Sequence, residues 1–460
     1  MTAVVTPAPA PAPPPEPTVA PRHDRWAAVV VWAVTAAMTA VGVGHVAAYG
    51  RNIPMSEDWH HVRPLTGAEP SFWGWVWAQN NEHRLPVARL VYRGLLEVTH
   101  DFRSGAVFDT LLMAAVAAAL VLLARRLRGR TALVDAAFPL LLLHPGNWEN
   151  LFWSWQMQFV VVAAMTLVLL AAVAGSTDPP SRRTTWVVAA MVVLLPLGGG
   201  TALPLVPFAV AALLVLAWSA DAGRSVRRVA GAASVLAVVE TGLYFVGWKA
   251  ATWYPDNPGP PETIETTGKL LALAWGPAAR GRYALFAVLT AAVLVPAAVL
   301  LVRAVRRAGP DRRPALALGL VLAGVAATAG AVAYGRAALV PTEGLADRYV
   351  IISVPAIVAA WFVVQRLGGD GVRRLVQGLV LFSAVVLLPV NWQRGYEWRD
   401  WYVGEMRAVE RDLDAGVTAE ELADRHGDFL MHWDHDELVR RIELLRDAGI
   451  GPVGDVAAGN

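Results

Sequence analysis

The chain has 460 residues, of which 56% are hydrophobic and only 17% are charged, and its mean hydropathy is +0.44. The formal net charge of +2 gives no bulk electrostatic basis for binding nucleic acid, and the absence of cysteine excludes disulfides, thiol catalysis and thiolate metal sites. Because many apolar stretches approach the ~20 residues that cross a bilayer, the composition predicts a multi-span membrane protein.

The N-terminal segment is the first element along the chain. It contains "PAPAPAPPPEP", and a sequence so rich in proline cannot form a helix. We therefore expect residues 1–25 to be a disordered cytoplasmic leader rather than a signal peptide, with the first apolar run retained as a span.

Apolar runs of span length then recur as far as residue 391. They predict an all-α protein, a polytopic membrane helix bundle of eleven spans in a membrane-embedded domain at 26–391. The third and fifth runs are short for a span. The expected spans are 26–48, 106–124, 131–143, 152–174, 184–197, 201–218, 229–248, 283–302, 315–334, 349–365 and 375–391.

Basic residues in the loops predict how the bundle is oriented. Short basic loops face the cytoplasm in membrane proteins, and here they alternate with loops at 144–150 and 197–201 that hold no Lys or Arg. A cytoplasmic N-terminus places every basic loop inside and the C-terminal segment outside. The basic loops are 125–130, 181–183, 223–228, 303–313 and 366–374.

Two sizeable segments are then expected outside the membrane, a long loop at about 50–105 and a tail at 392–460. The tail is acidic and alternates charged residues with Leu, Val and Ile at helical spacing, which predicts a small helical cap. A smaller external segment at 253–268 is so rich in Pro and Gly that we expect it to be irregular.

Four polar motifs lie on this external side. The first, "SEDW", places Glu57 and Asp58 next to each other, and His60 and His61 follow. Adjacent carboxylates can act as a general base for a hydroxyl or hold a divalent cation against a phosphate. The plainer alternative is a loop that is polar only because it is hydrated.

The other three motifs supply amides and arginines. They are "WAQNNEHRLP" (77–86), "ENLFWSWQ" (149–156) and "GRAALVPTEGLADRY" (335–349). An isolated arginine at a helix end is often only an anchor whose head reaches water, but a guanidinium also binds phosphate through paired hydrogen bonds. Because all four motifs share one side of the membrane, we expect them to converge on one site.

This layout resembles the GT-C superfamily of glycosyltransferases. The resemblance rests on the acidic pair after the first span, the long first external loop, the many further spans, the external tail and the four short motifs. It implies an inverting enzyme that transfers a sugar from a polyprenyl-phosphate donor to a glycan, lipid or protein acceptor of the cell envelope, at the outer face of the plasma membrane. Membrane lipid is a further expected partner, and nucleic acid is not.

The resemblance also implies roles for individual residues. Asp58 would be the general base, and Glu57 its neighbour or its partner in holding a divalent cation, Mg²⁺ or Mn²⁺. The order "ED" departs from the more usual two-aspartate form and leaves open which of the two is the base. The expected substrate-binding residues are Asn81, Glu82, His83, Arg84, Glu149, Gln156, Arg336, Arg348 and Tyr349.

Two other classes of protein fit parts of the sequence. A flippase or transporter for a lipid-linked sugar would hold its charged residues near the bilayer midplane, where the sequence offers little beyond Glu240. A non-catalytic scaffold protein of the envelope would need neither the acidic pair nor the arginines.

Overall fold

The computed structural model describes residues 22–219 and 222–455, and within these ranges the protein is almost entirely helical. Their one sheet is a two-stranded antiparallel hairpin of β1 (Gln79–Asn80) and β2 (His83–Arg84). The all-α prediction is therefore confirmed. Most of the expected leader at 1–25 lies outside the described residues, and helix α1 (Arg22–Tyr49) begins in its last part.

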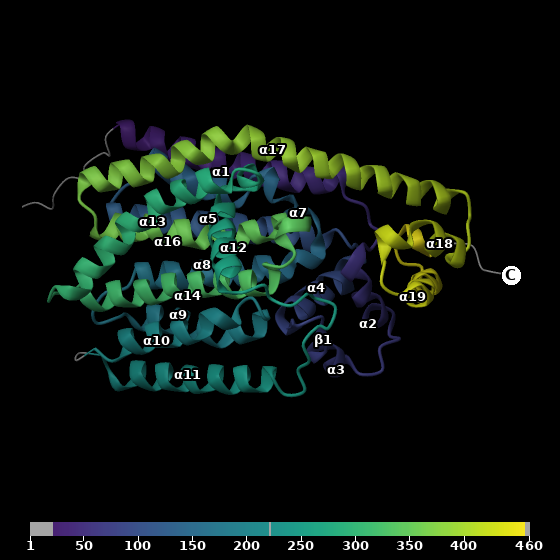
Figure 1. Cartoon of the computed structure of the whole chain (residues 1–460), viewed down its shortest axis with the longest axis horizontal. Coiled ribbons are helices and arrows are strands. Elements are labelled where there is room, and N and C mark those ends of the chain that lie inside the picture. The colour runs from purple at the N-terminus through teal and green to yellow at the C-terminus, as the bar shows by residue number, and fades with distance from the viewer. Residues whose placement is uncertain (1–21, 220–221, 456–460) are drawn as a thin grey trace, which may run out of the picture.

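Long helices lie side by side along the long axis of the molecule (Figure 1). In the described part of the chain, seven helical segments are long and apolar enough to cross a membrane, and each overlaps an expected span. This agrees with a multi-pass membrane protein. The helices concerned are α1, α5 (Ser104–Arg128), α8 (Met157–Ala174), α13 (Tyr283–Arg306), α14 (Arg312–Arg336), α16 (Val350–Leu367) and α17 (Asp370–Asp414).

Three further expected spans are helices that fall short of this description. Helices α9 (Arg182–Leu194) and α10 (Val206–Ala217) have only 13 and 12 residues. Helix α11 (Arg224–Tyr244) has 21 residues but carries charged side chains at its start and at Glu240. The count of eleven spans and the orientation of the bundle stay predictions.

The expected helix at 131–143 is broken, which corrects the sequence interpretation. A 3₁₀ turn, Leu133–Ala136, precedes the short helix α6 (Ala137–Leu142). The Asp135 carboxylate accepts a hydrogen bond from the Ala132 amide at 2.8 Å and tightens the turn. Pro145 then disfavours helical geometry at the residue before it. Residues 135–147 are all buried, so protein covers this irregular backbone.

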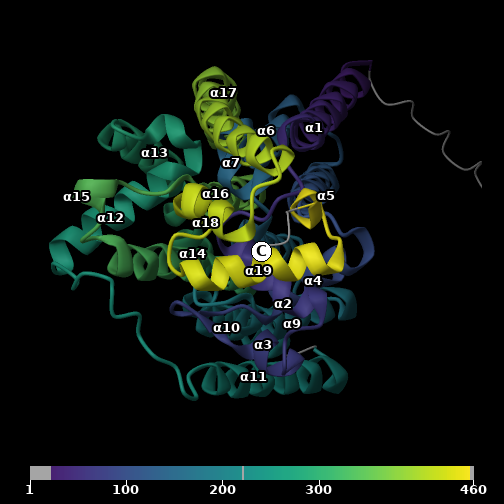
Figure 2. The same ribbon diagram turned by 90° about the vertical axis from the view of Figure 1, so that its right-hand side faces the viewer.

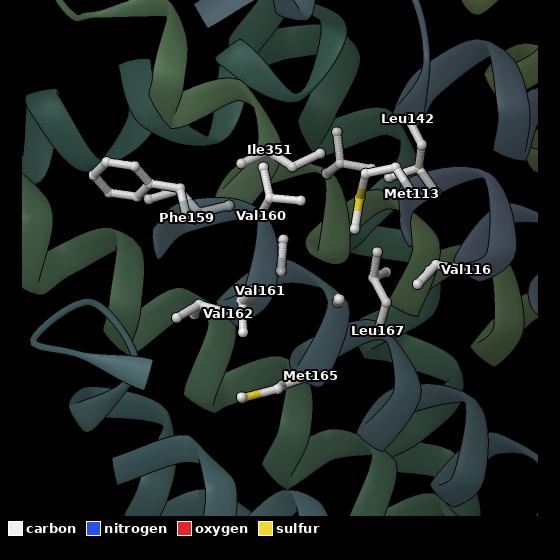
Figure 3. Packing of buried hydrophobic residues seen from close by; sticks show 14 of the residues in the cluster. Met113, Val116, Leu142, Phe159, Val160, Val161, Val162, Met165, Leu167 and Ile351 are labelled. Atoms are coloured by element: carbon white, nitrogen blue, oxygen red, sulfur yellow. The ribbon is translucent and has the colours of Figure 1, made fainter. Parts of the chain in front are cut away.

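Helices α8 and α16 form the centre of the bundle. Residues 350–365 of α16 are buried without interruption, and most of α8 is buried as well. Figure 3 shows Phe159 and Val160 of α8 packed near Ile351 of α16, with Met113 of α5 on the other side. Apolar side chains on the outside of α11 and α13 stay exposed, as expected of helices that face lipid.

We call the end of the bundle that carries the first loop and the tail the loop end. The first loop is structured there as the 3₁₀ turn η1 (Ser56–His61), α2 (Val62–Thr66), α3 (Phe72–Trp77), the hairpin and α4 (Pro86–Thr99). Helix α17 is 45 residues long, and its last part extends beyond the bundle (Figure 1). The expected boundary between residues 391 and 392 therefore falls inside one continuous helix.

The tail folds back from α17 onto the first loop. Its helices α18 (Ala419–Leu430) and α19 (His435–Ala448) pack against each other, and α19 also contacts α2. Figure 2 views the loop end and shows α19 in front of the first loop, where it contacts α2. The Glu437 carboxylate of α19 accepts two hydrogen bonds from Arg63 of the first loop, both at 2.7 Å.

The segment expected to be irregular at 253–268 is partly a helix. Helix α12 (Pro260–Ala272) begins inside it and lies across α13 and α14 (Figure 1). Pro260 and Pro261 occupy the first turn of α12, where a helix does not need their missing amide hydrogens. Only the part before Pro260 is irregular.

Candidate functional site

A cavity of about 540 Å³, which we call the main cavity, lies at the loop end, where the hairpin meets the ends of α11 and α14. One part of its wall is polar or aromatic, and the other part is apolar. The polar and aromatic residues are Glu82, His83, Tyr244, Trp248, Tyr254, Asp256, Asn257, Tyr334, Arg336 and Tyr349. The larger apolar residues are Phe159, Leu203, Pro204, Phe245 and Val332.

The hairpin presents two neighbouring side chains to this cavity. Asn81 forms its turn with a φ of 48°, a conformation that Asn tolerates better than most residues. Asn81 is exposed, and its carbonyl accepts a hydrogen bond from the Gln79 side chain at 2.6 Å. Asn81 therefore shapes the turn, and the next two residues, Glu82 and His83, line the cavity.

Arg84 anchors the hairpin. Its guanidinium donates hydrogen bonds to the carbonyls of Tyr244, Trp77 and Val246 at 2.7–2.9 Å, and its amide donates to the Tyr244 hydroxyl at 3.1 Å. With three carbonyls bound, Arg84 ties the first loop to the end of α11. In this arrangement it supports the cavity and does not line it.

Arg336, at the end of α14, lies at the centre of the polar wall. Its Nε donates to the Tyr349 hydroxyl at 2.8 Å, and its Nη2 lies 3.2 Å from Glu82 Oε1. The guanidinium also lies over the Tyr254 ring, 4.2 Å from the ring centre. His83 Nε2 is 3.4 Å from the same Glu82 oxygen. Two of the expected motifs, those at 77–86 and 335–349, thus supply one connected group of side chains.

Arg348 belongs to a second polar group next to the first. Its guanidinium pairs with Glu149 at 2.5 Å, and its amide donates to the same carboxylate at 2.8 Å. The Arg348 guanidinium also lies 5.7 Å from the centre of the Tyr349 ring. Tyr349 therefore lies between the two arginines, and Glu57 is within electrostatic range of Arg348.

Asp58 is enclosed away from the main cavity. Its side chain is 4% exposed, Oδ2 accepts a hydrogen bond from the Met55 amide at 3.3 Å, and Oδ1 has no partner among the described residues. Burial raises the pKa of the Asp58 carboxyl to about 8. The hollow beside it is only about 20 Å³. Gln156 is buried too, and its Oε1 has no partner in the described part of the chain.

The histidines of the first loop do not gather around Glu57 and Asp58. His61 is enclosed by the rings of Trp75, Tyr92 and Trp155, and His60 stacks on Trp433 of the tail. Across the ranges that the structure describes, no three His, Asp or Glu side chains form a group that could hold a metal ion. A divalent cation at Glu57 and Asp58 stays a prediction that rests on these two carboxylates.

Several cavity residues gave no signal in the sequence. Tyr244, at the end of α11, and Trp248, Tyr254 and Asn257, in the loop that follows, line the cavity. Gly200 also lines it, and a side chain there would collide with His83. The "WYPDNP" stretch was expected to be irregular, and the loop that contains it is held beside the hairpin by contacts of Trp248 and Lys249 with residues 166 and 170 positions earlier.

A second cavity of about 470 Å³ lies between α1, α4 and α5. Its walls are mainly apolar, with Arg103 and Asp101 at one edge. These two side chains pair with each other at 2.7 Å. The charged groups of the second cavity are therefore paired with each other, and Ser104 Oγ is a lining atom without a partner among the described residues.

Comparison with known proteins does not identify a family for this chain. No protein-family model matches the chain, and neither a curated protein nor a solved structure matches it. The assignment of a function therefore rests on the cavity itself.

Proposed function

We propose that the protein transfers a sugar from a polyprenyl-phosphate donor to a cell-envelope acceptor, and that the main cavity binds the donor. The observation that carries the proposal is the division of this cavity into an apolar part and a polar part built around Arg336. A polyprenyl-phosphate sugar has the same division, with a hydrocarbon chain, a phosphate and a polar ring.

The apolar part suits the prenyl chain. Leu203, Pro204 and Phe159 supply a wall without charge, and each buried methylene contributes about 0.8 kcal/mol to binding. Phe245 and Tyr334 line the cavity and are also 52% and 64% exposed on the outside of the bundle. A lipid can therefore enter from the side, between the ends of α11 and α14.

The polar part suits the phosphate and the sugar. Arg336 already shares its guanidinium with a carboxylate and a hydroxyl. A phosphate can replace the carboxylate because each presents two anionic oxygens that accept paired hydrogen bonds from the planar guanidinium. Trp248 offers a ring face on which a sugar can stack. Negative charge that develops on the departing phosphate would be stabilised by Arg336.

The loop end would face outside the cell in this proposal. The expected cytoplasmic loops carry the basic residues, whereas the first loop, with the main cavity, and the acidic tail lie together at the other end of the bundle. A site on that face has access to a lipid-linked donor and to acceptors of the envelope.

The experiment that tests the proposal follows a labelled polyprenyl-phosphate sugar in vesicles that contain the purified protein and candidate acceptors. We expect wild type to transfer the label and Arg336→Ala to bind the donor about 10- to 100-fold more weakly, because a charge-assisted hydrogen bond contributes about 1.5–3 kcal/mol. Arg374→Ala is the matched control, since Arg374 is exposed and donates a hydrogen bond to the Asp370 carbonyl of its own helix.

Two results would contradict the proposal. Movement of the intact lipid across the bilayer without transfer would favour a flippase. Neither transfer nor donor binding, with the protein correctly folded, would favour the envelope scaffold.

A further inference from the structure

We propose that His83, positioned by Glu82, is the general base that takes the proton from the acceptor hydroxyl. This inference rests on the proposed function and assigns its proton acceptor to the hairpin instead of the η1 turn. It differs from the role of Asp58 that the family resemblance implies.

The position of the two turns is the first argument. Among the ionisable side chains of the first loop, the main cavity is lined by Glu82 and His83 and by neither carboxylate of the η1 turn. A general base must come within about 2.6–3.2 Å of the proton that it removes, directly or through one water. A substrate held at Arg336 can meet this requirement at the hairpin.

The geometry of the pair is the second argument. His83 and Glu82 side chains are 20% and 24% exposed, so the substrate can reach them. His83 Nδ1 is enclosed against Gly200 without a partner among the described residues, which leaves Nε2 as the nitrogen that can meet a hydroxyl. Glu82 Oε1 lies 3.4 Å from this same nitrogen, so its negative charge is close enough to stabilise the imidazolium once the proton has arrived.

The charges around His83 are the third argument. Burial lowers the pKa of His83, the Glu82 carboxylate raises it and the Arg336 guanidinium lowers it. Tyr244, from α11, and Tyr254, from the loop that follows, are further titratable groups beside this part of the hairpin. The imidazole is therefore neutral near pH 7 and able to accept a proton.

Donor binding then changes this balance in a useful direction. A phosphate on Arg336 offsets the positive charge that holds the pKa of His83 down and releases Glu82 from its ion pair. His83 becomes a stronger base when the donor is in place.

The reaction balances as follows. The acceptor proton moves to His83 Nε2, the acceptor oxygen forms a bond to the anomeric carbon, and the bond from that carbon to the phosphate oxygen breaks. The electron pair leaves on polyprenyl phosphate beside Arg336, and His83 later returns its proton to water.

The test compares His83→Gln with His100→Asn in the purified full-length protein. His100 is an exposed residue of the same loop with a φ of 49°, which Asn accepts. We expect His83→Gln to lower kcat by about 10²- to 10⁴-fold, to bind the labelled donor as wild type does, and to lose the acid limb of the pH–rate profile. His100→Asn should keep the wild-type kcat and profile.

Glu82→Gln separates the two members of the pair. Loss of its negative charge destabilises the imidazolium, so the acid limb should move to lower pH and kcat should fall by less than in His83→Gln. In wild type the acid limb of kcat should lie at higher pH than that of kcat/KM, because only kcat reports the donor complex.

The outcomes distinguish this inference from the proposed function. Transfer by His83→Gln at the wild-type rate, or a greater loss in Glu82→Gln than in His83→Gln, would overturn the inference and leave the function standing. An inactive wild type with every donor would overturn both.

Discussion

Two turns of the first loop have similar residues and different surroundings. The η1 turn holds Glu57, Asp58 and two histidines, and the hairpin holds Glu82 and His83. Asp58 and His61 of the η1 turn are 4% and 0% exposed and face rings and backbone, whereas the hairpin pair faces a cavity of about 540 Å³. A polar motif can bind a substrate only where the fold leaves room for one beside it.

The largest expected effect is a difference in cysteine labelling that reports the side of the membrane on which both turns lie. The chain has no native cysteine, so one can be introduced at the exposed Ala68 of the first loop and another at the exposed Gly309 between α13 and α14. We expect an impermeant maleimide to label Ala68→Cys in intact cells and Gly309→Cys only after permeabilisation. The reverse pattern would place the main cavity in the cytoplasm.

The next effect tests how closely the hairpin must fit. A Cβ atom at Gly200 would collide with His83, while Gly231 of α11 has open space around it. Gly200→Ala should therefore displace His83 and slow transfer on the order of 10²-fold, as a shift of about 1 Å does in many enzymes. Gly231→Ala is the control. Equal rates for both variants would show that His83 needs no exact position.

A moderate effect is expected from Asp58. Its pKa is raised to about 8 in the folded protein, so the folded state holds a proton that the unfolded chain releases above about pH 4. The stabilisation is fully present below pH 4 and is lost as the pH rises towards 8.

We therefore expect thermal unfolding in detergent to occur at lower temperature as the pH is raised from about 5 to about 8, and to depend less on pH in Asp58→Asn. Glu57→Gln controls for the loss of a charge in the same turn. Parallel curves for wild type and Asp58→Asn would contradict the enclosed position of Asp58. Transfer should fall less in Asp58→Asn than in His83→Gln.

The smallest effect, on stability, is expected where helix α19 of the tail contacts α2 of the first loop. The Glu437 carboxylate pairs with Arg63, Arg440 and Arg441 at 2.7–2.9 Å, and these hydrogen bonds lower its pKa to about 2 against the effect of its burial. Its contribution is present above about pH 4.5 and lost as the pH falls towards 2. Glu437→Gln should reduce the free energy of unfolding by about 1 kcal/mol at pH 7, since the cluster is partly exposed.

Denaturant unfolding measures this change, and Glu443→Gln on the same helix is the control. A loss as large as that of a buried ion pair, about 3–5 kcal/mol, would mean that the tail is essential to the fold of the first loop.

The sequence predicted the long apolar helices well because hydropathy over some 20 residues is a local property. The sequence-based prediction failed where the local composition of a segment differs from the structure that its tertiary contacts impose. Residues 131–143 have the apolar content of a span, but the 3₁₀ turn Leu133–Ala136 interrupts them and α6 is only six residues long. Helix α12 contains two prolines, but they fall in its first turn, where proline is accepted.

The candidate site could be predicted only in part, because residue types are visible in the sequence but tertiary contacts are not. The contacts of Arg336 with Glu82, and of Arg348 with Glu149, join motifs whose convergence was predicted from their shared side of the membrane. Which acidic turn faces a cavity depends on the loop after α11, including Tyr254 and Trp248, and on the space left by Gly200. Neither periodicity nor residue type carries that information.

The most direct test of the central claim is a structure of the full chain with a non-transferable polyprenyl-phosphate sugar analogue. We predict the phosphate within hydrogen-bond distance of Arg336, roughly 2.7–3.2 Å, with the sugar beside His83 and the prenyl chain along Leu203 and Pro204. An analogue bound instead in the second cavity between α1, α4 and α5, or beside Asp58, with the main cavity free of lipid, would contradict the account.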